Sequence, residues 1–223
     1  MTRTKLIDRN LPKYTKGEEI FNMVTHIVGG AVGVATLVLG IIISCFKGSL
    51  TALLCSIVFG TSMIALYTVS SIYHGLHPGT AKKVFQVLDH CTIYFLIAGT
   101  YTPMLLCALM RVNILAAHII FVIVWGLTAL AVTLNAIDIK SYKTFSMLCY
   151  IGIGWSIIIS IVDMYRALGG LGFFLLLGGG VVYTLGTLFY AAGKRIKYFH
   201  SVFHLFVVVG SIMHSLSVLL FAL

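Results

Sequence analysis

The sequence predicts an all-α integral membrane protein, a bundle of seven transmembrane helices with its N-terminus in the cytoplasm and its C-terminus outside the cytoplasm. Composition predicts the membrane class, because 60% of the 223 residues are hydrophobic and only 9% are charged, a balance that soluble domains do not show. Apolar runs of about 20 residues, the length that crosses a bilayer, recur along the whole chain and predict the helices.

Seven apolar runs are long enough to span, and short connections join them, which predicts one membrane domain over residues 20–223. A polar cytoplasmic segment, residues 1–19, precedes it and lacks the apolar core of a secretory signal. The first run is too long for a cleaved signal, so we expect it to be retained as a helix. The runs cover residues 20–46, 50–74, 84–107, 113–134, 144–162, 169–192 and 198–222.

The uneven distribution of basic residues sets the expected orientation. Of the 15 lysines and arginines, 12 precede the first run or follow the second, fourth and sixth, whereas Lys47, Arg111 and Arg166 fall on the other side. The excess of positive charge on cytoplasmic loops therefore places the N-terminus inside, and anionic lipid headgroups, not nucleic acid, are the expected partners of the net charge of +9. The 12 residues are Arg3, Lys5, Arg9, Lys13, Lys16, Lys82, Lys83, Lys140, Lys143, Lys194, Arg195 and Lys197.

The last apolar run carries three histidines, His200, His204 and His214. Residues four apart on a helix lie on one face about one turn from each other, so His200 and His204 are close enough to share a metal ion. His214 follows ten residues later and returns to roughly the same face. It is too deep for the same ion, and we expect it in a supporting polar shell.

Polar side chains also gather at the ends of the first and second runs. Glu19, Asn22 and His26 open the first run at spacings of three and four residues, and Ser70 and His74 lie four apart at the end of the second. Such spacing places each set on one helical face. We expect the first set to line a shared site, with a helix end that reaches the membrane interface as the alternative.

Asp89 is a carboxylate inside the third run, where insertion costs about 2.5–3.5 kcal/mol and is tolerated only with a partner, here expected to be cationic. With the N-terminus inside, all of these run ends fall at the cytoplasmic face.

Three histidines with an open position form the ligand set of a catalytic zinc site, whereas a structural site closes with a fourth protein ligand. Imidazoles also suit other divalent metals, and we expect Zn²⁺.

Four segments, EEIFNMVTH, SSIYH, LDHCTIYFLIAGTYTP and FHSVFHLFVVVGSIMH, strongly resemble the bacterial hemolysin III family, which belongs with the progestin and adipoQ receptors, including the adiponectin receptors. The resemblance extends over all seven runs. It implies one zinc near the cytoplasmic side, bound by His74, His200 and His204. It also implies that Asp89 holds the water on the zinc, and it matches Ser70 to the serine of the family motif.

The expected activity follows from this chemistry. Zinc on three neutral imidazoles makes bound water more acidic and polarises a carbonyl, which favours hydrolysis. We expect Asp89 to orient the water and take its proton. We expect Ser70 to form a hydrogen bond with the substrate or with an imidazole. The resemblance, which reaches the alkaline ceramidases, implies a lipid substrate. We therefore expect a zinc-dependent, ceramidase-like hydrolase of a lipid amide or acyl bond in the cell membrane, contributing to membrane lipid homeostasis.

Two other functions compete with the hydrolase. The first is a pore-forming cytolysin, which the family name suggests, although seven retained apolar runs are typical of an integral protein and not of a secreted toxin. The second is a receptor-like membrane sensor in which a structural zinc only holds the helices together. Asp89→Asn separates the enzyme from the sensor, because it removes the proton acceptor and leaves the three histidines in place.

Overall fold

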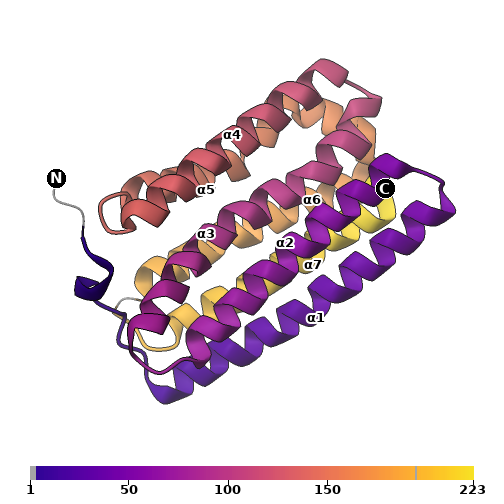
Figure 1. The fold of residues 1–223 in the computed structure, drawn as a ribbon. Coiled ribbons are helices and arrows are strands. Elements are labelled where there is room, and N and C mark those ends of the chain that lie inside the picture. The colour runs from indigo at the N-terminus through magenta and orange to yellow at the C-terminus, as the bar shows by residue number, and fades with distance from the viewer. Residues whose placement is uncertain (1–3, 194) are drawn as a thin grey trace.

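The computed structural model describes residues 4–193 and 195–223, so Arg3 and Lys194 of the charge count lie outside the described residues. Within this range the chain forms a helical bundle without strands (Figure 1). The α-helices are α1 (Lys16–Phe46), α2 (Leu50–Gly75), α3 (Thr80–Pro103), α4 (Ile114–Asp138), α5 (Lys143–Gly154), α6 (Ile161–Ala192) and α7 (Phe199–Ser217). The shorter elements are 3₁₀-helices at Leu6–Asp8, Leu109–Arg111 and Ser156–Ser160 and π-helices at Met104–Ala108 and Val218–Ala222.

Six helical segments of the described chain are long and apolar enough to cross a membrane. This confirms the predicted class of all-helical membrane protein. The expected fifth and sixth runs, residues 144–162 and 169–192, fall together in one segment of 49 residues. The six segments are Lys16–Phe46, Leu50–Gly75, Thr80–Arg111, Ile114–Asp138, Thr144–Ala192 and Phe199–Ala222.

The 49-residue segment is interrupted at Gly169, whose φ of 68° and ψ of 175° are not helical. Residues on the two sides of this glycine contact each other. Trp155 Nε1 donates a hydrogen bond to Thr184 Oγ1 at 2.9 Å, and the rings of Tyr165 and Phe173 lie 5.5 Å apart. The chain therefore reverses direction at Gly169, where glycine is suited because a left-handed φ costs it no steric strain.

The starts of α1 and α7, far apart in the sequence, are joined by one carboxylate. Glu18 closes a capping box with Thr15 at the start of α1, accepting from Thr15 N at 2.8 Å. Its other oxygen accepts from the backbone N–H of Tyr198 at 2.8 Å, just before α7 begins. The residues that open α1 and α7 are therefore held at the same end of the bundle (Figure 1).

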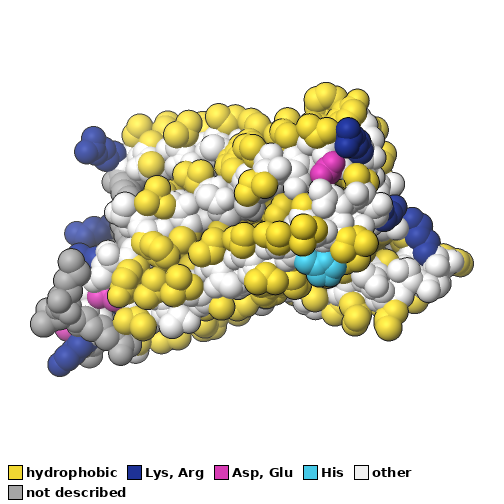
Figure 2. Space-filling model, turned by 90° about the horizontal axis from the view of Figure 1, so that it is seen from above, with side chains coloured by type: hydrophobic (Ala, Val, Ile, Leu, Met, Phe, Trp, Pro, Cys, Tyr) yellow, Lys and Arg dark blue, Asp and Glu magenta, His cyan; other side chains and the backbone are white. Residues whose placement is uncertain are grey.

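Helices α1 and α2 pack closely enough that a glycine is required. A Cβ atom added to Gly29 would lie 2.4 Å from the ring of Tyr67, and such small residues let helices approach in lipid. The outer surface is apolar, with large exposed side chains such as Ile27 and Leu115. Figure 2 shows hydrophobic side chains along the length of one face and lysines and arginines toward its two ends, as a bilayer-facing surface requires.

Candidate metal centre

Three histidines from two helices converge at the end of the bundle where α1 and α7 begin. His74 comes from the end of α2, and His200 and His204 come from the first turns of α7. One ring nitrogen from each lies within 4.8 Å of the others, and the Nε2 atoms of His200 and His204 are 3.1 Å apart. The predicted convergence of these three imidazoles is therefore present.

Glu19 orients the imidazole of His74 through a hydrogen bond. His74 Nδ1 donates to Glu19 Oε2 at 2.6 Å, and Nε2 of the same ring is buried without a hydrogen-bond partner in the described chain. A carboxylate on the far nitrogen of a histidine fixes the tautomer and ring orientation that metal binding needs. Glu19, expected in the polar shell, thus directs a free lone pair toward His200 and His204.

Lys82, which the sequence analysis counted only among the basic residues that set the expected orientation, also belongs to the site. Its side chain is 3% exposed. Its ammonium donates to Glu19 Oε1 at 2.7 Å and to the carbonyl of Leu76 at 2.9 Å. The turn after α2 returns the start of α3 over the site, so this lysine neutralises the carboxylate that supports His74.

His26 and Asn22 extend the polar cluster along α1. The ring of His26 stacks on that of His204, with centroids 3.8 Å apart, and both of its nitrogens are buried without partners among the described residues. Asn22 Nδ2 lies 3.5 Å from His74 Nδ1, and its buried Oδ1 has no partner. These unpaired polar atoms lie beside His74 and His204.

The nitrogens fit a zinc ion. Neutral imidazole nitrogens are ordinary zinc ligands, and here His74 offers an unpaired Nε2 while two further Nε2 atoms, of His200 and His204, face each other at 3.1 Å. Without a cation, one of these two Nε2 atoms must carry a proton to bond the other, while Nε2 of His74 has no partner in the described chain. A metal that accepts all three lone pairs would give the Nε2 of His74 a partner as well.

Ser70 and Asp89 occupy different positions around the cluster. Ser70 is 1% exposed and lies one turn before His74 on α2. Asp89 is partly exposed on α3, and it is not one of the three residues whose ligand atoms converge in the described chain. The structure therefore places the aspartate outside the ligand set.

Three tyrosines, which the sequence analysis missed, surround the histidines. The Tyr14 ring stacks on His200 at 4.9 Å with an interplanar angle of 17°, Tyr73 contacts His74 at 4.7 Å, and Tyr190 contacts His200 at 5.7 Å. These rings line the histidines from α2, α6 and the segment before α1.

Tyr14 belongs to the polar N-terminal segment and covers the site from outside the helices. Burial raises the pKa of its hydroxyl, which therefore stays protonated and remains a hydrogen-bond donor at neutral pH. A tyrosine in a polar segment carries no periodic signal. Of the three tyrosines, only Tyr73 could have been predicted from the sequence, because it directly precedes His74 in the SSIYH segment.

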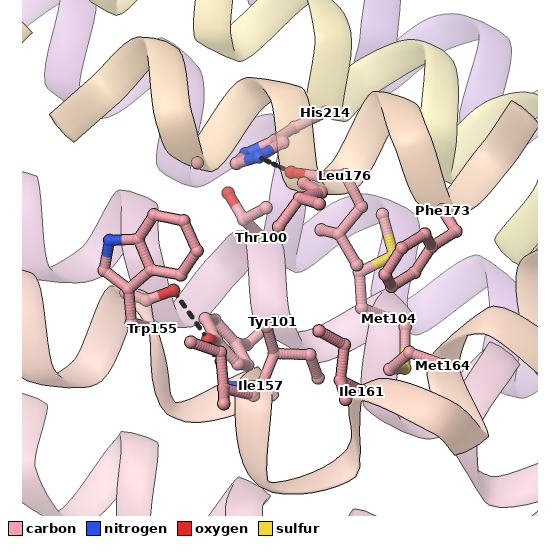
Figure 3. Close-up of a pocket in the computed structure, with 14 residues that line it drawn as sticks. Thr100, Tyr101, Met104, Trp155, Ile157, Ile161, Met164, Phe173, Leu176 and His214 are labelled. Atoms are coloured by element: carbon pink, nitrogen blue, oxygen red, sulfur yellow. Dashed lines mark hydrogen bonds between the residues drawn. The ribbon is translucent and has the colours of Figure 1, made fainter. Parts of the chain in front are cut away.

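His214 lies outside the cluster, contrary to its expected place in the polar shell. Its Nε2–H donates to the carbonyl of Leu176 at 3.0 Å, and its ring contacts Tyr183 edge-on at 5.1 Å. Figure 3 shows it with Thr100 and Trp155 at the wall of a cavity of about 40 Å³. Ten residues of helix separate it from His204, about 15 Å of rise, so the shared face does not bring it to the ligands.

Comparison with known proteins gives consistent matches over nearly the whole chain. A family described as "Haemolysin-III related" matches residues 14–215. Hemolysin-3 of Bacillus cereus is 37% identical over 206 residues, 92% of this chain and 92% of that protein, and the Hemolysin-3 homolog of Bacillus subtilis (strain 168) is 36% identical over 198 residues, 89% and 91%. Monocyte to macrophage differentiation factor of Homo sapiens is 28% identical over 162 residues, 70% and 66%.

Proposed function

This chain belongs to the haemolysin-III related family, and we propose that it is a zinc-dependent hydrolase that cleaves an amide or acyl bond of a membrane lipid. It is a multi-pass protein of the bacterial cell membrane. The observation that carries the proposal is the convergence of His74, His200 and His204 within 4.8 Å, with the far nitrogen of His74 held by Glu19.

The proposed topology has seven crossings, a cytoplasmic N-terminus and an extracytoplasmic C-terminus. The reversal at Gly169 supports two crossings within the segment Thr144–Ala192. The basic residues before α1 and after α2 support a cytoplasmic position for the end that carries the histidines. A substrate would therefore reach the site at the cytoplasmic leaflet.

His74, His200 and His204 would hold the zinc. When bound, zinc supplies a Lewis acid that polarises the scissile carbonyl and lowers the pKa of water. Asp89 accepts the proton of the attacking water, a general-base role that contributes about 10²–10⁴-fold in rate. The hydroxyl of Tyr14, protonated at neutral pH, donates a hydrogen bond to the substrate carbonyl oxygen, and Ser70 orients the substrate or an imidazole from the next turn of α2.

The location of the site supports a lipid substrate. The bundle presents large apolar side chains to the bilayer along its length (Figure 2), and the polar cluster occupies the ends of its helices near one membrane surface. A lipid places its amide or ester bonds near that depth, between the headgroup and the acyl chains. Bond cleavage there would release a fatty acid into the membrane.

The test measures metal and product on the same detergent-purified samples. Metal analysis of the wild type should give an equimolar amount of zinc, and mass spectrometry should detect metal-dependent release of fatty acid from mixed bacterial lipids. His200→Ala should lose both. The matched control is His118→Ala, which removes an exposed histidine whose Nδ1 bonds only the Ile114 carbonyl in the described chain, and it should retain both.

Cytolysis is the second candidate, because two relatives carry the name hemolysin. Lysis of red cells by the purified wild type that persists in His200→Ala would favour it over the hydrolase. Zinc without turnover would instead favour a receptor-like sensor in which the metal pins α2 to α7. Absence of zinc from the wild type would overturn the proposed centre.

A further inference from the structure

A polar segment before α1, residues 4–15, runs across the end of the bundle that carries the histidines. It contains the 3₁₀-helix Leu6–Asp8, which lies against α3. The backbone on either side of this short helix is extended, with ψ of 148° at Lys5, 131° at Arg9 and 159° at Thr15. Figure 1 shows the segment leaving the start of α1 and passing the helix ends. We call residues 4–15 the strap.

The N-terminal end of the strap is tied to the end of α4. The backbone N–H of Thr4 donates to Asp138 Oδ2 at 2.8 Å, across 134 residues of sequence. Asp138 is 2% exposed, and its carboxylate also accepts from Lys140 N and from Ser141 Oγ, at 3.0 Å each. One buried carboxylate therefore holds both the turn after α4 and the strap.

Arg9 makes a second contact with α4. The residue is buried, and its Nη2 donates to the carbonyl of Ile137 at 3.4 Å, in the last turn of the helix. A cation is favoured there, because the last carbonyls of a helix lack donors within it and form the negative end of its dipole. Nε and Nη1 of Arg9 are buried without a partner among the described residues, which costs free energy. Release of Arg9 to water would satisfy both nitrogens, so this contact is one that can open.

The other end of the strap covers the histidines. The ring of Tyr14 stacks on that of His200, with centroids 4.9 Å apart and an interplanar angle of 17°. It is also tilted over His74, with centroids 5.8 Å apart. One aromatic ring of the strap therefore contacts candidate ligands from both α7 and α2.

The contacts of Thr4 and Arg9 with α4, which we call the latch, control a short piece of chain. Thr15 closes the capping box that fixes the far end of the strap to α1. Four residues separate Arg9 from Tyr14, and one of them is Pro12, whose ring fixes φ. Release of the latch therefore frees Tyr14 to move, whereas the start of α1 stays in place.

We propose that the strap is a lid over the histidine site, and that Asp138 and Arg9 are positioning residues that hold it closed. The proposal rests on the proposed function, because the open lid admits the lipid substrate and the closed lid brings the Tyr14 hydroxyl to the substrate carbonyl. Opening breaks the latch and the ring contacts of Tyr14, and it leaves the capping box intact.

The test measures how fast diethyl pyrocarbonate modifies His200 in the full-length protein in detergent, after a chelator has removed bound metal. Peptide mass spectrometry gives the rate at a temperature well below the unfolding midpoint of every variant. His77, an exposed histidine between α2 and α3, is the internal reference. Tyr14→Ala removes the cover, so it should raise the rate at His200 and define the value for an open lid.

Two latch variants should raise the same rate. Thr4→Pro removes the N–H that Asp138 accepts, since proline has none, and Arg9→Ala removes the second contact with α4. Each should raise the rate at His200 about 2–10-fold, the change in the ratio of open to closed forms that loss of one hydrogen bond gives. Thr4→Ser keeps the N–H, and Ser141→Ala removes a different bond to the same carboxylate. Both of these controls should match the wild type.

Two results would overturn the lid. One is a wild-type rate in both latch variants together with a faster rate in Tyr14→Ala, because the ring would then keep its place without the latch. The other is an unchanged rate in Tyr14→Ala, which would show that the ring does not cover His200. Failure of the proposed hydrolase is a separate outcome, since a protein without zinc or fatty-acid release still gives these modification rates.

Discussion

The two ends of α7 carry buried histidines in opposite chemical situations. Near the start of the helix, His200 and His204 meet His74, and Nε2 of His74 and Nδ1 of His204 have no hydrogen-bond partner among the described residues. Farther along, His214 gives its N–H to the Leu176 carbonyl and packs against Tyr183 beside a small cavity (Figure 3). Burial and helical face are the same in both places.

The difference shows that buried imidazoles come together into a possible metal site only where another helix brings a further imidazole to the same depth. α2 supplies His74 and α1 supplies Glu19 at the first position. At the second position, α6 supplies a backbone carbonyl, which satisfies the ring.

The largest effect is expected on metal content. His204→Ala removes one of three nitrogens and should reduce bound zinc from equimolar to background, as measured by metal analysis after gel filtration. His214→Ala should retain zinc while lowering stability by about 1–3 kcal/mol through the unpaired Leu176 carbonyl. Equal zinc loss in both variants would refute the distinction between the two ends.

Asp89→Asn should separate binding from chemistry. The amide cannot accept a proton, so kcat should fall by about 10²–10⁴-fold with zinc content unchanged. Fatty-acid release and metal content measured on one preparation provide the check. Unchanged turnover would remove Asp89 from the mechanism and leave the histidine site intact.

Glu19→Gln should weaken zinc binding by about 10–100-fold, the usual effect of altering the partner of a ligating histidine. Competition with a fluorescent chelator measures the change. Glu18→Gln is the matched control, because Glu18 bonds Thr15 and the start of α7. It should reduce thermal stability and leave the zinc affinity of the folded protein close to that of the wild type.

The smallest effect is expected at the aromatic cover. Tyr14→Phe keeps the ring on His200 and removes the hydroxyl, so zinc affinity should be unchanged while kcat falls. Tyr14→Ala also removes a stacked contact worth about 0.5–1.5 kcal/mol, which corresponds to roughly a 2–10-fold weaker zinc affinity. A chelator competition series across the three proteins distinguishes the ring from the hydroxyl.

Much of the site was predictable from spacing. His200 and His204 share a face because they are four residues apart, and the orientation of the runs brought His74 and Glu19 to the same end. The contact of Lys82 with Glu19 was not predictable. A lysine in a short connection is usually exposed to solvent, and only the turn between α2 and α3 places this one over Glu19. The contact of Tyr14 with the histidines was also not predictable, because its segment has no helical periodicity.

Sequence alone determined the all-helical membrane class and the shared face of His200 and His204, because hydropathy and helical period are local properties of the chain. Tertiary structure decided which polar residues act together. It joined Glu18 to Tyr198 across 180 residues, buried Lys82 and turned His214 toward α6. The physical reason is that a hydrogen bond depends on separation in space, which only the packing of the helices sets.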